Sequence, residues 1–167
     1  EEWLKRQSVG PDFSCRDPQF ADSFDFIYGE TVLSNIYFIS NKTLNYIDTE
    51  CLFRVQDAVP RLWNPEDGVI SEQFVYTKEE EGVSMPVVLP PGGSVFVVFN
   101  KKTSRPGLQS LEKEKAGGMY DLPVEKVIAA NRKSFLIECW ENASYMLNTK
   151  DGKQKQGFKK SAAVEIR

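Results

Sequence analysis

Histidine is absent from this chain of 167 residues. Without an imidazole, the chain has no Ser-His-Asp or Cys-His nucleophile system, no histidine zinc ligand and no ordinary pH switch near neutrality. Long apolar runs are missing too, so no segment is long enough to be a membrane span and no signal peptide is visible. Basic residues form no stripe and the net charge is -3, so neither nucleic acid nor a membrane is expected as a partner.

Cysteine is scarce, and its spacing excludes a clustered metal site. Cys15, Cys51 and Cys139 lie far apart and form no CxxC pair, so a zinc cluster is not expected. No other metal and no cofactor is predicted. One disulfide could form, which would leave one thiol over. The favoured interpretation is three small buried hydrophobes, because free cysteine is among the most buried residue types.

The residues that are present describe an ordinary globular protein built of strands. Hydrophobic residues make up 41% of the chain and charged residues 27%, which is not the composition of a disordered protein. Apolar and polar residues alternate with a period of two between turn residues, which is typical of half-buried strands. The expected strands are 23–28, 35–40, 50–55, 73–77, 83–89, 93–99, 134–140, 144–149 and 153–158.

These strands predict a mainly β fold, an antiparallel β-sandwich with an additional β-hairpin or meander segment and little helix. Residues 1–22 are expected to be a helix end and a linker from an upstream domain, and residues 23–103 the sandwich. Residues 104–123 are expected to be an exposed connection with a short helix around Leu111, and residues 124–167 a meander leading to a further module. Because the chain begins at Glu1 without methionine, it is expected to be a piece of a longer protein.

A motif around Trp63 is the most distinctive local feature. An aromatic face can stack on a sugar ring while a carboxylate such as Asp67 bonds its hydroxyls, and Trp140 is a second candidate for such a platform. The favoured alternative is that Trp63 plugs the end of the sandwich and that residues 64–68 are only a turn, since tryptophan is highly buried on average.

Acidic residues offer two further chemistries, and neither is favoured. Glu79–Glu81 lacks the alternating ligand spacing of a calcium loop, so a solvated hairpin turn is expected there. Glu138 with Glu141, or Asp48 with Glu50, would supply the two carboxylates of a glycosidase. Such pairs are common in sequences, and nothing places either pair in one cleft, so no catalytic residue is assigned.

Two segments match the glycosylation sequon, Asn41-Lys42-Thr43 and Asn142-Ala143-Ser144. Both fall where simple turns are expected, and the pattern by itself is weak.

Four motifs follow one another between residues 10 and 100. They are GPDF at 10–13, DFIY at 25–28 with NIYFISN at 35–41, FRV at 53–55 with PRLWNPEDG at 60–68, and PPGGSVFVVF at 90–99. In this order they resemble the large glycoside hydrolases of family 106, the α-L-rhamnosidase-like proteins abundant in gut Bacteroidota. Asn64 and Gly29 depart from the usual family residues, and neither departure is expected to alter the fold.

The resemblance implies a role without chemistry of its own. In such enzymes the acid, the base and the calcium ligands would belong to a barrel upstream of this chain, so no catalytic residue is carried over. The chain would be a non-catalytic accessory domain of an enzyme acting on plant or other complex polysaccharides, in the periplasm or outside the cell. Its partners would be the upstream catalytic barrel and a downstream β-sandwich. The alternatives are a carbohydrate-binding module and an adhesion or assembly domain with no sugar role.

Overall fold

The computed structural model describes residues 10–101, 108–113, 126–130, 135–138, 144–149 and 154–158. The chain divides into two compact units, Glu1–Arg105 and Pro106–Arg167. The described residues form antiparallel strands and one 3-10 turn, with no α-helix among them. The prediction of a mainly β, antiparallel sandwich is confirmed.

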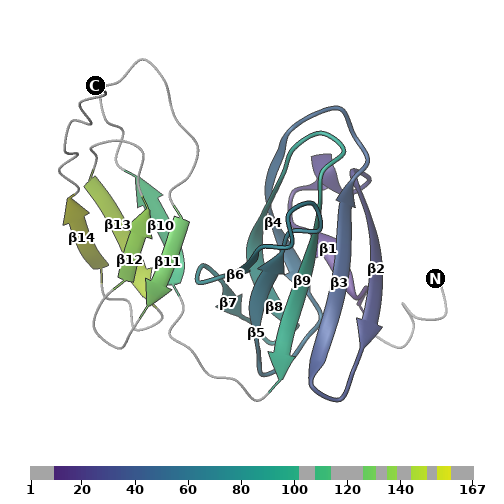
Figure 1. The fold of residues 1–167 in the computed structure, drawn as a ribbon, viewed down its shortest axis with the longest axis horizontal. Coiled ribbons are helices and arrows are strands. Elements are labelled where there is room, and N and C mark those ends of the chain that lie inside the picture. Colours follow the sequence, from purple (N-terminus) through teal and green to yellow (C-terminus); the bar gives the residue numbers. More distant parts are fainter. Residues whose placement is uncertain are drawn as a thin grey trace. The chain divides into compact units, whose positions relative to one another are not determined.

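The first unit is a sandwich of two sheets, which lie face to face in Figure 1. The four-stranded sheet has the order β1-β4-β8-β7, and the five-stranded sheet has the order β2-β3-β9-β5-β6. The strands are β1 (Phe13–Cys15), β2 (Phe24–Glu30), β3 (Ser34–Asn41), β4 (Ile47–Phe53), β5 (Ala58–Trp63), β6 (Ile70–Glu72), β7 (Thr77–Lys78), β8 (Val83–Leu89) and β9 (Ser94–Lys101).

Alternation along each strand decides which side chains enter the core. In β4, Ile47, Cys51 and Phe53 are buried while Asp48 and Glu50 are exposed, as expected when successive side chains point to opposite faces. β3 lies between β2 and β9, so it is an inner strand of its sheet.

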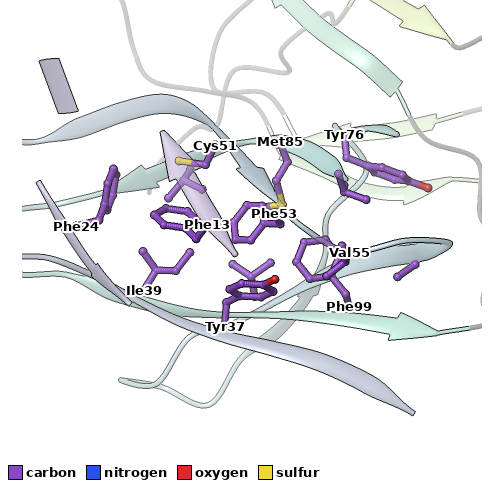
Figure 2. Packing of buried hydrophobic residues seen from close by; sticks show 14 of the residues in the cluster. Phe13, Phe24, Tyr37, Ile39, Cys51, Phe53, Val55, Tyr76, Met85 and Phe99 are labelled. Atoms are coloured by element: carbon purple, nitrogen blue, oxygen red, sulfur yellow. The ribbon is translucent and has the colours of Figure 1, made fainter. Parts of the chain in front are cut away.

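An aromatic cluster fills the space between the sheets (Figure 2). The rings of Tyr37 and Phe53 meet edge to face with centroids 5.1 Å apart, and Phe53 also lies 5.1 Å from Phe99. Phe13 reaches the same cluster at 5.2 Å from Phe53. Edge-to-face and tilted contacts of this kind add to the stabilisation from burial alone.

The amino-terminal part of the described chain differs from its prediction. Residues 12–22 were expected to be a connecting loop, yet β1 pairs with β4 and a 3-10 turn forms at Pro18–Phe20. β2 also runs through Gly29 and Glu30, past the end expected at residue 28, and the chain turns at residues 31–33. A three-residue strand is too short for its alternation to stand out in a sequence, so only its pairing reveals it.

The segment from β5 to β7 also corrects the sequence interpretation. β5 contains Pro60, a residue usually confined to sheet edges, and was not expected. The Pro60 carbonyl accepts a bond from Gln73 N at 3.3 Å, on the side of β5 away from β9. The proline nitrogen points to that same side, so it removes no bond from the β5–β9 ladder. Of the strand expected at 73–77, Thr77 lies in β7, whereas residues 73–76 cross from β6 to β7. Phe74 and Tyr76 are buried along this crossing.

The second unit contains a three-stranded sheet, β10-β13-β14, and a two-stranded sheet, β11-β12. The expected hairpin of residues 144–149 and 153–158 is confirmed as β13 and β14. Residues 108–113 form a strand and not an exposed connection with a helix, because pairing with β13 overrides their weak strand propensity. The bounds are β10 (Leu108–Lys113), β11 (Lys126–Ala130), β12 (Phe135–Glu138), β13 (Ser144–Thr149) and β14 (Gln154–Phe158).

Several predictions lie outside the described residues. They concern the helix end at 1–7, the sequon at Asn142, and the residues Cys139, Trp140 and Glu141.

Candidate functional site

Trp63 is the last residue of β5 and the first landmark of a candidate surface. Trp63 is 39% exposed. The favoured interpretation, in which this side chain is buried at the end of the sandwich, is therefore wrong. The following residues do form a tight turn. Asn64 N donates to Val69 O at 2.9 Å, and Gly68, whose φ is 71°, donates to Asn64 O at 2.9 Å.

Strand register places Trp63 in a row that crosses all five strands of its sheet. Ile27 lies opposite Phe38, and Phe38 lies opposite Phe96. Trp63 lies opposite both Phe96 and Ile70. Directly opposed residues share one face of an antiparallel sheet, so these five side chains, here called the outer row, line a single face.

The outer row faces away from the aromatic core. Its neighbours along β3 and β9, Tyr37 and Val97, point into the core and are fully buried, so Phe38 and Phe96 point outward. The two outward rings lie 4.8 Å apart and are tilted by 51°. Ile27 is 70% exposed and Ile70 56% exposed at the two ends of the row.

The residues beside the outer row grade from apolar to charged. On one side, Ile36 and Val98 are opposite each other, and Val98 is opposite Arg61. Arg61 in turn forms an ion pair with Glu72 of β6, Nε to Oε1 at 2.8 Å. On this side the face thus continues through Ile36, which is partly exposed, and Val98, which is buried, before it reaches a charged border.

On the other side, the outer row has a polar border. Asp25 is opposite Ser40, and Ser40 is opposite Ser94. Asp25 Oδ1 lies 3.2 Å from Lys42 Nζ. An apolar centre with a polar, charged border is the anatomy of a protein–protein interface.

Asp67 was predicted to bind a sugar together with Trp63. In the structure its carboxylate stabilises the turn that follows β5. Its Oδ1 accepts a bond from Val69 N at 2.8 Å, and Asn64 Oδ1 accepts one from Glu66 N at 2.9 Å. These are Asx turns that hold the hairpin between β5 and β6. The role of Trp63 and Asp67 in carbohydrate binding stays a prediction.

Two groups of acidic residues considered as catalytic or calcium-binding candidates lie on strand β4 and in the turn between β7 and β8. Asp48 and Glu50 share the exposed face of β4, and Glu50 bonds the hydroxyl of Ser84. Glu79 N and Gly82 O close the turn between β7 and β8 at 2.8 Å, which confirms the hairpin at Glu79–Glu81. Across the described ranges, no group of three or more acidic or cysteine side chains gathers in a way that could hold a metal ion.

Sequence reasoning missed four of the five residues of the outer row. The usable signal was that residues 35–40 and 93–99 are apolar at successive positions, and therefore on both faces of their strands. Such runs are typical of sheets covered on both sides.

No helix in the described part of the chain has the length and hydropathy of a membrane span.

Comparisons with known proteins agree with the ordered motifs. Residues 1–78 match the model of glycoside hydrolase family 106, described as alpha-L-rhamnosidase. A protein of Formosa agariphila named "Putative beta-glucuronidase" is 30% identical over 143 residues, which are 82% of this chain. The structure of a rhamnosidase from Novosphingobium sp. PP1Y is 25% identical over 77% of this chain, with a TM-score of 0.56.

Both relatives are far longer than the regions that match. This chain spans 12% of the length of the Formosa protein and 11% of the Novosphingobium chain. The relationship to glycoside hydrolase family 106 that the ordered motifs predicted is confirmed, and the chain is related to a β-rich region of these proteins.

Proposed function

We propose that the chain is a non-catalytic accessory module of a rhamnosidase-like glycoside hydrolase and that the outer row docks against another module of the same polypeptide. The observation that carries the proposal is the outer row itself, an apolar line across all five strands on the face opposite the core. This chain spans about a ninth of the length of its relatives. The expected partner is therefore another module from the rest of such a polypeptide. In this proposal the parent protein acts in the periplasm or outside the cell.

The composition of the surface favours a protein partner. Its centre holds aromatic and β-branched side chains without charge. Arg61 lies at its border, and arginine is enriched at interfaces relative to the rest of the protein surface. Contiguous apolar surface on a soluble protein generally marks an interaction site. Ile27 and Ile70 are the two most exposed members of the row. A flat apolar partner would remove both side chains from water.

A saccharide fits the centre of this surface less well. The rings of Phe38 and Phe96 are tilted by 51° to each other, so they do not form one flat stacking plane. Sugar hydroxyls also need hydrogen-bonding partners, whereas Ile36 and Val98 adjoin the rings on one side. The Arg61 guanidinium at that border is already paired with Glu72.

The test compares the 167-residue chain with a longer polypeptide that carries it together with its flanking modules. The double variant Ile27→Lys, Ile70→Lys places two charges at the ends of the row. In the isolated chain these exposed positions should change the free energy of unfolding by no more than about 0.5 kcal/mol each. In the longer polypeptide, the buried charges should lower the melting temperature of this module by several degrees.

Leu44→Lys is the matched control, because Leu44 is 94% exposed on the β3–β4 loop, outside the row. It should be neutral in both proteins. A double variant that is neutral in the longer polypeptide as well would overturn docking through this row. Hydrolysis of an aryl rhamnoside by the 167-residue chain alone would overturn the non-catalytic assignment.

Carbohydrate binding is the second candidate, and the 39% exposure of Trp63 is the observation that favours it. Calorimetric titration of the isolated chain with rhamnose-containing pectic oligosaccharides tests it. Saturable heat that disappears in Trp63→Ala would replace the docking proposal with a binding-module assignment. No heat at millimolar ligand would remove this candidate.

A further inference from the structure

Two of the three cysteines meet across neighbouring strands of the four-stranded sheet. Cys15 of β1 lies directly opposite Cys51 of β4. Both are free thiols in the structure. Nothing in the spacing of the sequence singles out this pair, because 35 residues separate the two positions.

The hydrogen-bond pattern of β1 and β4 brings the two side chains close together. Arg16 N donates to Glu50 O at 2.8 Å, and Arg54 N donates to Asp12 O at 2.9 Å. Hydrogen-bonded and non-hydrogen-bonded pairs alternate along an antiparallel ladder, so Cys15 and Cys51 form a non-hydrogen-bonded pair. In such pairs the Cα atoms are about 4.5 Å apart, which lies within the range of roughly 4.4–6.8 Å that a disulfide requires.

The two thiols have different surroundings. Cys51 is fully buried in the core, opposite Met85 of β8 (Figure 2). Cys15 is partly exposed, and its Sγ lies 3.4 Å from Thr49 Oγ1. Burial raises the pKa of the Cys51 thiol, and the neighbouring Cys15 thiol raises it further through charge repulsion and a hydrogen bond. Cys51 therefore favours the protonated form in the folded protein.

We infer that Cys15 and Cys51 form a cross-strand disulfide when the chain folds in an oxidising compartment, and that this bond fixes β1 to the sandwich. β1 is a three-residue strand at the edge of its sheet, and β4 is its one neighbour among the strands that the structure describes. A covalent link at its last residue would hold it against fraying and anchor the chain that precedes it. The inference stands independently of the accessory role proposed above.

The oxidant is a disulfide compound, either glutathione disulfide or a thiol–disulfide oxidoreductase. The Cys15 thiolate attacks one sulfur of the oxidant, which forms a mixed disulfide and releases one thiol. The Cys51 thiolate then attacks Cys15 Sγ, which forms the protein disulfide and releases the second thiol. The two protein thiols lose two protons and two electrons, and the oxidant is reduced to two thiols.

The order of events follows from burial. The second step needs the Cys51 thiolate, and the folded protein disfavours that form. Oxidation should therefore be fast during folding, while Cys51 is still in water, and slow once the sandwich has closed. Cys15 should be the thiol that reacts first with an added reagent in the folded state.

The experiment refolds the 167-residue chain from denaturant in a glutathione redox buffer and maps its disulfides by mass spectrometry without reduction. A Cys139→Ser background removes the third thiol as a competitor. The expected product is a linked pair of peptides containing Cys15 and Cys51, lighter by two hydrogen atoms than the reduced pair. Its melting temperature should exceed that of the reduced protein by about 5–15 °C, and a reductant should abolish the difference.

Cys15→Ser is the matched control, because this partly exposed position tolerates a hydroxyl better than the buried Cys51. The variant should fold and show no redox-dependent shift in melting temperature. Recovery of both thiols unlinked after refolding in the oxidising buffer would overturn the inference. So would a linked protein that melts below the reduced one, since the bond would then distort β1 and not secure it.

Discussion

Asn41 Nδ2 donates a hydrogen bond to the carbonyl of Pro90, with the two atoms 2.9 Å apart. The same amide nitrogen donates to Asn45 O at 2.8 Å, and Asn41 Oδ1 accepts from Thr43 N at 2.9 Å. One buried side chain thus ties the β3–β4 loop to the β8–β9 loop. Because Asn41 is only 1% exposed, its amide is a structural bridge and not an accessible glycosylation site.

Replacing Asn41 should therefore destabilise the sandwich. Asn41→Ala removes a buried amide and leaves the carbonyls of Asn45 and Pro90 without this donor, and we expect a loss of about 2–4 kcal/mol in the free energy of unfolding. Asn41→Asp should cost more, since it places a carboxylate against those same carbonyls. Urea denaturation measures both. Asn45→Ala, at an exposed neighbouring position, should be neutral; an equal loss there would show that the loop and not the Asn41 amide matters.

Tyr37 is buried in the aromatic cluster, and its hydroxyl has no hydrogen-bond partner among the described residues. Tyr37→Phe keeps the ring contacts with Phe53 and Phe99 and removes an unpaired polar atom. We expect the stability at pH 7 to be unchanged or slightly raised. A loss above about 1 kcal/mol in thermal or urea unfolding would contradict this account of the hydroxyl.

Tyr37 also predicts how the sandwich responds to alkaline pH. Burial raises the pKa of its phenol, so the folded state favours the neutral form while the unfolded chain ionises near pH 10. Above that pH the unfolded state binds fewer protons, and stability falls as pH rises. Melting temperatures between pH 8 and 11 should decline less in Tyr37→Phe than in the wild type. Parallel declines would mean that Tyr37 does not titrate on unfolding.

Gly82 allows β8 to pass close to the end of β4. A Cβ at this position would lie 2.0 Å from the carbonyl oxygen of Phe53, a backbone atom that cannot move alone. We expect Gly82→Ala to lower the free energy of unfolding by about 2–4 kcal/mol. Gly29→Ala is the control, because no atom of the described part of the chain lies within 4 Å of a Cβ at that position. Gly29→Ala should be neutral or slightly stabilising.

The ion pair between Glu30 and Lys101 predicts how stability changes at acid pH. Lys101 Nζ lies 2.5 Å from Glu30 Oε1, and the hydrogen bond and charge of Lys101 lower the pKa of Glu30 below its usual value. A lowered pKa in the folded state contributes stability above the ordinary glutamate pKa, and this is lost as pH falls through the folded value. The small difference between wild type and Glu30→Gln at pH 7 should therefore shrink as pH falls below the usual glutamate pKa. A difference that stays constant over this acid range would exclude the ion pair as its source.

The sequence identified most of the strands and the relationship to family 106, because both depend on local patterns. The alternation around Cys51 and Phe53 predicted their burial, and the turn residues at 64–68 predicted a tight hairpin. It missed β5, because Pro60 resembles a strand breaker until its neighbours are known. It also predicted a helix near Leu111, where pairing with β13 makes a strand.

What the tertiary structure alone decided is which residues from distant strands share one face. Trp63 is exposed because it pairs with Phe96, whose side chain lies on the outer face of the sheet. The sequence favoured burial instead, because tryptophan is buried in most proteins. The outer row and the Cys15–Cys51 pair both depend on the register between strands that are not adjacent in sequence. Alternation with a period of two assigns each side chain to a face of its own strand, but only the hydrogen bonds between strands determine which faces coincide.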